Sequence, residues 1–287
     1  MKRFLFTLVA AFMSAIVVVP AHAQETAPTQ PLKVLLVIGG CCHDYTAQSK
    51  ILKEGIEQRI RADVTVEFSE DTSTGARFGV YESDDWAEGY DVILHDECSA
   101  SVTERPYVDR ILAEHANGTP AVNLHCAMHS YRWGDYKQPV EPGADNAGWY
   151  EMIGVQSSSH GPKAPIDVDY ISEQHPIVKG LEDWATTDDE LYNNVRVFGS
   201  AESLASGKQV QGPKGKKSPQ SKPKVATAVV AWTNLYGPKK TRIFSTTLGH
   251  FNETVNDTRY LDLVVRGLLW TTGNLNDDGT PMPGFVK

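Results

Sequence analysis

The sequence predicts an α/β fold: a doubly wound, mainly parallel sheet flanked by helices, as in flavodoxin-like proteins. Three observations support this class. Short apolar runs of strand length alternate with amphipathic segments of helix length, and Gly, Pro or Asn marks many of the junctions. The first run, 32–38, is almost continuously apolar and closes on Gly39 and Gly40, which is typical of a strand buried on both faces.

The remaining elements follow in the same alternation. A helix at 46–61 has apolar residues at helical spacing, and 64–68 returns to strand character. The pattern then predicts a strand, a helix and a strand at 91–95, 103–117 and 120–125. The second half is less regular, with strands expected at 166–170, 195–198, 225–232 and 242–248 and a closing amphipathic helix at 259–270.

The domain is expected at 32–273. The two ends of the chain and one internal stretch differ from it in composition. Residues 1–23 have the charged, apolar and small-residue order of a signal peptide, with cleavage near Ala23, and 24–31 is expected to be a disordered leader. Residues 206–224 carry six Lys and little that is apolar, which predicts a solvated surface loop. The tail, 274–287, is expected to be mobile.

Charge and hydropathy exclude some classes of binding partner. Removing 1–23 takes away Lys2 and Arg3 and no acid, so the formal charge moves from −9 to −11, which argues against a nucleic-acid partner. No later stretch is long and apolar enough for stable membrane insertion. We therefore expect a periplasmic or secreted protein with a small-molecule partner. A monomer and a homo-oligomer both stay open.

The four cysteines, Cys41, Cys42, Cys98 and Cys126, mostly lie at ends of predicted strands. In an oxidising compartment they favour one disulfide, with Cys98 and Cys126 as one candidate pair, although sequence cannot fix the pairing. A thiol nucleophile at Cys126 is the less favoured alternative.

Four histidines, His43, His95, His125 and His250, lie at or just after predicted strand ends. Ligands of open α/β sheets bind beyond the carboxyl ends of the strands, so these side chains are expected to meet. Imidazole transfers protons near neutral pH and binds metals. The pattern predicts His125 and His250 as catalytic residues, and His43, His125 and His250 as ligands of a divalent metal such as zinc.

Neighbouring residues complete the predicted site. Glu253 follows His250 by three residues and could orient its imidazole as in a catalytic triad, although a helix-capping role fits equally well. Substrate-binding candidates are Asp44 beside His43, His160 in a flexible loop, and aromatic residues able to stack on sugars: Trp149, Tyr150 and Tyr192. No G-x-G-x-x-G, P-loop, G-x-S-x-G or H-E-x-x-H motif occurs.

A set of short motifs in a fixed order resembles the ThuA-like (trehalose-utilisation) family over nearly all of the mature chain. The motifs are 122–125, 148–150, His160, 175–181, 189–192, 230–232 and 247–250. The resemblance implies a fold like that of class I glutamine amidotransferases and a role in the use of trehalose and related disaccharides. At the positions of the amidotransferase triad it places His125, His250 and Glu253. A His in place of the nucleophilic Cys argues against glutamine hydrolysis.

Two hypotheses of different classes follow. The first is an enzyme of carbohydrate catabolism that acts on a sugar or an oxidised (keto) glycoside by His-assisted proton transfer, with a metal as a candidate electrophile. The second is a carbohydrate-binding or scaffolding protein that keeps the fold without the chemistry.

Overall fold

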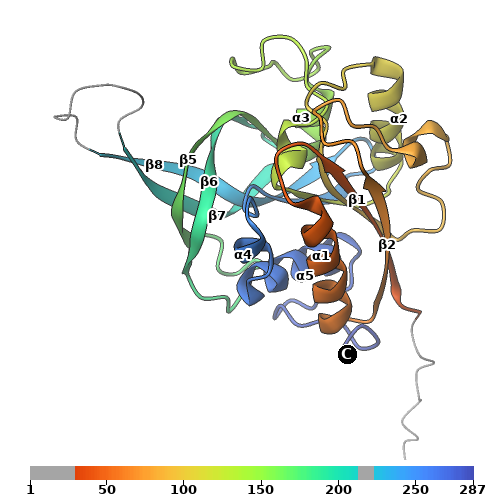
Figure 1. Ribbon diagram of the computed structural model, residues 1–287. Coiled ribbons are helices and arrows are strands. Elements are labelled where there is room, and N and C mark those ends of the chain that lie inside the picture. Colours follow the sequence, from red (N-terminus) through yellow and green to blue (C-terminus); the bar gives the residue numbers. More distant parts are fainter. Residues whose placement is uncertain (1–29, 213–222) are drawn as a thin grey trace, which may run out of the picture.

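The computed structural model describes residues 30–212 and 223–287, and shows one nine-stranded mixed sheet with helices packed against it (Figure 1). The strand order is β2-β1-β3-β4-β9-β8-β7-β5-β6. The strands are β1 (Leu32–Gly40), β2 (Ala62–Ser69), β3 (Val92–Cys98), β4 (Ala121–Leu124), β5 (Val155–Tyr170), β6 (Trp184–Val197), β7 (Ala201–Gln211), β8 (Lys224–Tyr236) and β9 (Thr241–Thr246). The helices are α1 (Tyr45–Arg59), α2 (Arg105–Ala116), α3 (Gly148–Ile153), α4 (Asn252–Val255) and α5 (Thr258–Thr271), with 3-10 turns η1 (Gly79–Glu82) and η2 (His125–His129).

The half of the sheet from β2 to β9 is parallel, and its inner strands β1, β3 and β4 are buried on both faces. Alternate residues of β1 point to opposite faces: Val34 and Leu36 join the core beneath α1 and α5, while Leu35 and Val37 join the core beneath α2 and α3. This double burial explains the near-continuous apolar runs of these strands. It also places the carboxyl ends of β1, β3, β4 and β9 along one edge of the sheet.

The other half of the sheet corrects the expectation of a mainly parallel sheet. β8, β7, β5 and β6 pair antiparallel with their neighbours, so among the described residues parallel and antiparallel strand pairs are equally frequent. β5 and β6 are much longer than the strands expected at 166–170 and 195–198. Their additional residues are largely polar, half-exposed, and interrupted by register shifts, so they lack the apolar signal that a buried strand carries.

Two further expectations change. Ser206–Gln211 are part of β7 and Lys224 begins β8. The backbone hydrogen bonds that hold a strand form with polar side chains as well as with apolar ones. Residues 213–222 of the expected loop lie outside the described part of the chain. The tail packs rather than moving freely: Phe285 is buried, and its carbonyl accepts a hydrogen bond from the Arg61 backbone N–H. The expected signal peptide, and most of the leader, also lie outside the described residues. Among the residues described, no helix has the length and apolarity needed to cross a membrane.

Candidate active site

Three imidazoles from distant parts of the chain meet at the carboxyl edge of the parallel strands. His43 follows β1, His125 follows β4 and His250 follows β9. Their ring centroids lie 4.6 Å (His43 to His250), 4.8 Å (His43 to His125) and 5.3 Å (His125 to His250) apart. One nitrogen from each ring lies within 4.8 Å of the others. The convergence expected from the strand ends is therefore present.

His125 is held in a sharp turn that fixes its ring. It begins η2 with φ of 35°, a left-handed conformation that costs a non-Gly residue about 1–2 kcal/mol and often marks functional sites. Its Nδ1 donates a hydrogen bond to the carbonyl of Thr247 at 2.6 Å. Because a carbonyl can only accept, the proton sits on Nδ1 and Nε2 is left with a free lone pair. That Nε2 lies 3.3 Å from Nδ1 of His250.

His43 is held by the backbone of the third member of the cluster. Its Nδ1 donates to the carbonyl of His250 at 3.2 Å, so its Nε2 is the nitrogen available to a ligand. Burial, reinforced by the neighbouring imidazoles of His125 and His250, lowers the pKa of His43 to about 2. Its ring is therefore neutral at ordinary pH, the form that binds metals.

Glu190 on β6 is the carboxylate partner of the cluster. Its Oε2 lies 3.4 Å from Nδ1 of His250 and 3.7 Å from Nε2 of His125, and its Oε1 lies 3.3 Å from Nδ1 of His160. Burial raises the pKa of Glu190, but hydrogen bonds from His125 and His250 and the charges of His125 and His160 outweigh burial and lower the pKa overall. Glu190 is therefore a carboxylate placed to stabilise a proton on either ring.

Asp189, the preceding residue, organises the backbone of this site. It is fully buried, and its carboxylate accepts hydrogen bonds from the backbone N–H groups of Gly249 (3.0 Å), His250 (3.2 Å) and Glu190 (2.7 Å). Charge-assisted bonds of this kind are stronger than neutral ones. Asp189 thus fixes both the loop after β9 and the strand that carries Glu190.

The cluster opens onto a cavity of about 490 Å³. Tyr192 forms one wall, with its ring stacked on that of His129 at 4.2 Å between centroids and an interplanar angle of 5°. Arg132 and Lys163 bring positive charge to the lining, and Nη1 of Arg132 is buried without a hydrogen-bond partner in the described part of the chain. The cavity thus combines aromatic side chains with one unsatisfied donor, which suits a polar ring compound.

Several residues expected at the site have other roles. Trp149 and Tyr150 of α3 are both almost fully buried, and the Trp149 indole donates to the carbonyl of Ala127 at 2.8 Å, so they are core residues rather than stacking surfaces. Asp44 is exposed and caps α1 through the Ala47 N–H. Burial removes Trp149 and Tyr150 from the expected substrate-binding set, whereas Asp44 lines a surface pocket together with His43 and His250 and stays a candidate.

Other expectations need correction as well. Glu253 is exposed on α4 and has no hydrogen bond to His250 in the described part of the chain, although it lines a surface pocket together with His43 and His250. His160 lies on β5, opposite Tyr192, rather than in a flexible loop. His95 is buried inside β3, where its Nε2 lies 3.0 Å from Nε2 of His115, outside the cluster.

The sequence reading missed Glu190 as the acid of the cluster. The available signal was the adjacent pair Asp189 and Glu190 in a polar strand, and burial of such a pair is what marks it as functional. Periodicity could not reveal that burial because β6 alternates irregularly.

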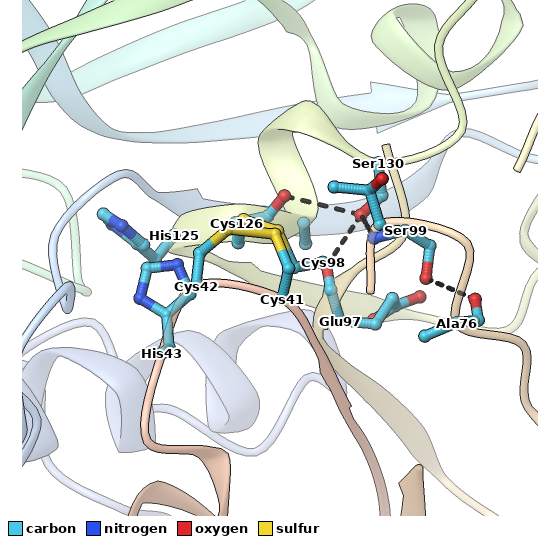
Figure 2. Close-up of a disulfide and its surroundings, with 12 residues drawn as sticks. Cys41, Cys42, His43, Ala76, Glu97, Cys98, Ser99, His125, Cys126 and Ser130 are labelled. Atoms are coloured by element: carbon cyan, nitrogen blue, oxygen red, sulfur yellow. Dashed lines mark hydrogen bonds between the residues drawn. A yellow bond between two sulfur atoms is a disulfide. The ribbon is translucent and has the colours of Figure 1, made fainter. Parts of the chain in front are cut away.

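The cysteines form two disulfides, Cys41 with Cys42 and Cys98 with Cys126, beside the imidazoles (Figure 2). The second pair is the candidate that the sequence offered, and the Cys41–Cys42 bond is additional to the one disulfide expected. Since no cysteine of the described residues is free, Cys126 does not serve as a nucleophile in this state.

Comparison with known proteins agrees with the geometry of the fold. Two solved structures of proteins described as ThuA-like share it. The protein from Parabacteroides merdae has a TM-score of 0.60 and 20% identity, over 84% of this chain and 90% of that one. The protein from Bacteroides uniformis has a TM-score of 0.58 and 17% identity, over 87% of this chain and 95% of that one. At these identities the likeness shows the fold alone. No curated protein matches the chain.

The family model ThuA, described as trehalose utilisation, matches residues 33–271. That range contains both halves of the sheet and every residue of the imidazole cluster. The chain therefore belongs to the ThuA family.

Proposed function

We propose that this protein is an enzyme of carbohydrate catabolism that moves a proton beside a carbonyl group of a sugar or an oxidised (keto) glycoside. The observation that carries the proposal is the position of Glu190, a buried carboxylate within 3.7 Å of the imidazoles of His125, His160 and His250. Glu190, His160 and His250 line the cavity. Such a carboxylate–imidazole set is costly to bury and is typical of proton-transfer sites.

Each residue has a definite part in this chemistry. His250 lines the cavity and takes the substrate proton, and Nε2 of His125, which has a free lone pair 3.3 Å from His250 Nδ1, is the base that accepts it in turn. The imidazolium so formed is stabilised by Glu190, as a triad carboxylate stabilises its histidine. His250 lies between the two, 3.3 Å from His125 and 3.4 Å from Glu190, and can return the proton from His125 to the substrate. Arg132 faces the same cavity and is the donor for the substrate carbonyl oxygen.

As an alternative to proton transfer by these rings, the same three imidazoles fit a divalent metal ion, because a nitrogen bound to a metal has no lone pair left to accept a proton. In tetrahedral zinc sites with Zn–N bonds of about 2.1 Å, ligand nitrogens lie about 3.4 Å apart. The observed 3.3 Å between His125 and His250 matches that spacing. We propose His43, His125 and His250 as the ligands, with Glu190 next to them. A bound ion would supply a Lewis acid that polarises the substrate carbonyl.

The substrate class and the location are part of the same proposal. Tyr192 and His129 bring aromatic side chains to the lining of the cavity, beside the place of a sugar ring, and the family description points to disaccharide use. We propose export to the periplasm or beyond, after cleavage near Ala23. The two disulfides support an oxidising compartment.

The test is solvent exchange. The protein is incubated in D2O with a panel of 3-keto-disaccharides and the parent sugars, and deuterium at the carbon beside the carbonyl is followed by NMR. Exchange by the wild type is expected to fall at least about 100-fold in Glu190→Gln and in the double variant His125→Ala/His250→Ala. Glu253→Gln is the matched control, since this acid lies outside the cluster, and should exchange at the wild-type rate.

The alternative of a sugar-binding protein without chemistry predicts a different pattern. The panel sugars would bind the wild type and the double variant equally, and no deuterium would enter any of them. That combination would contradict the proposal that the protein is an enzyme.

A further inference from the structure

The two disulfides lie next to each other on the wall of the cavity (Figure 2). Sγ of Cys41 lies 3.5 Å from Sγ of Cys98, so one disulfide touches the other. The sheet fixes this contact, because Gly40 at the end of β1 pairs in register with Cys98 at the end of β3. Sulfurs that belong to two different disulfides are thus held in van der Waals contact.

The two pairs differ in exposure. Cys42 is exposed and Cys41 is partly exposed, whereas Cys98 is 4% and Cys126 is 6% exposed. An incoming thiol therefore reaches Cys42 first. The inner pair is reached most directly through Cys41.

We propose that these cysteines are a thiol–disulfide exchange site that accepts electrons from a thiol compound entering the cavity and passes them from Cys41–Cys42 to Cys98–Cys126. This activity is separate from the imidazole chemistry and nothing in the family description implies it.

The steps balance. Two substrate thiols (RSH) reduce Cys41–Cys42, giving one substrate disulfide (RSSR) and two cysteine thiols. The Cys41 thiolate then attacks Sγ of Cys98; the Cys41–Cys98 bond forms, the Cys98–Cys126 bond breaks, and Cys126 leaves as a thiolate that takes the proton lost by Cys41. The Cys42 thiolate next attacks Cys41, which restores Cys41–Cys42 and releases Cys98 as a thiol. The substrate is oxidised and the inner disulfide is reduced.

Two single variants test the contact between the pairs. In Cys42→Ser, the free Cys41 thiol is expected to displace Cys126. In Cys126→Ser, the free Cys98 thiol is expected to displace Cys42. Both variants should therefore yield the same Cys41–Cys98 disulfide, seen by mass spectrometry of a non-reducing digest after alkylation. The control, Cys98→Ser, should keep Cys41–Cys42 intact. Recovery of only the original disulfide, with an alkylated Cys41 or Cys98, in both variants would overturn the proposal.

Electron transfer is tested with the folded full chain under anaerobic conditions. Reduced glutathione and reduced thioredoxin serve as a small thiol and a protein dithiol. With at least one of the two donors, the wild type is expected to lose both disulfides, and the double variant Cys41→Ser/Cys42→Ser should lose Cys98–Cys126 at least about tenfold more slowly. The donor that works identifies the source of the thiol. Equal rates for the inner pair in both proteins, or no reduction by either donor, would contradict the relay.

Discussion

Nδ1 of His250 lies 3.3 Å from Nε2 of His125, although 125 residues separate them in the chain. The sheet explains this contact, because β4 and β9 are parallel neighbours with Leu124 in register with Thr246. Each strand ends within four residues of its histidine. The cluster therefore depends on the loop between Thr246 and His250 as much as on the strands.

The carboxylate that holds this loop gives the first prediction. Asp189→Asn replaces an acceptor of three backbone N–H groups by an amide that has one acceptor oxygen and presents its own N–H groups. The free energy of unfolding, from urea denaturation, should fall by about 3 kcal/mol, and solvent exchange on keto-sugars should fall with it.

Its control is the neighbouring exposed acid. Asp188→Asn should change the unfolding free energy by no more than about 0.5 kcal/mol. Similar values for the two variants would mean that Asp189 does not organise the loop.

Metal binding by the imidazoles is the second prediction. After dialysis against a chelator, calorimetric titration with zinc chloride should show one strong site per chain, and His250→Ala should weaken it by at least about 100-fold, since loss of even outer partners of a zinc site costs 10–100-fold. His175→Ala is the control, because His175 packs against Trp270 away from the cluster. Equal affinity in both variants would place the ion elsewhere.

The sequence predicted the parallel half of the fold well, because strands buried on both faces have nearly continuous apolar sequences. Since parallel strands end at one edge, it also predicted that His43, His125 and His250 would meet. It could not predict the extent of β5 and β6, whose polar residues resemble a loop.

For the same reason, the sequence did not identify Glu190 as the acid of the site. Glu190 reaches the cluster only through the antiparallel half of the sheet, so no spacing along the chain connects it to His250. Glu253 was the nearer acid in sequence, but one helical turn carries it to the surface. The burial of Trp149 depends on how α3 packs against the rest of the core, and the sequence of α3 alone does not predict that packing.

The third prediction concerns pH. His115 is fully buried, its Nδ1 donates to the carbonyl of Thr119 at 2.8 Å, and its Nε2 faces His95. Burial, with a smaller effect of His95, lowers the pKa of His115 from 6.5 to about 3. Between these values the unfolded chain binds a proton that the native state does not, so stability falls as the pH falls from 6.5 towards 3.

The variant His115→Gln keeps hydrogen-bonding groups but has no titrating ring. Its unfolding free energy should depend less on pH between 6.5 and 4, by up to ~1.4 kcal/mol per pH unit, when both proteins are measured by urea denaturation. Parallel curves for wild type and variant would show that His115 is protonated equally in both states.

The last prediction concerns the approach of β1 to β3. Gly40 has φ of 98°, and a Cβ added there would lie 2.5 Å from the carbonyl oxygen of Cys98, a backbone atom that cannot move aside. Gly143 has φ of 77° but open space around it, so it isolates the conformational cost alone. Gly143→Ala should therefore lose about 1–2 kcal/mol of unfolding free energy, and Gly40→Ala at least about 3 kcal/mol.

Because Gly40 directly precedes the Cys41–Cys42 pair and His43, Gly40→Ala should also lose zinc affinity and Cys41–Cys98 exchange, whereas Gly143→Ala should keep both. Equal losses of stability in the two variants would mean that the strand ends can separate without cost, and the sheet would then not be what holds the sulfur and imidazole atoms in contact.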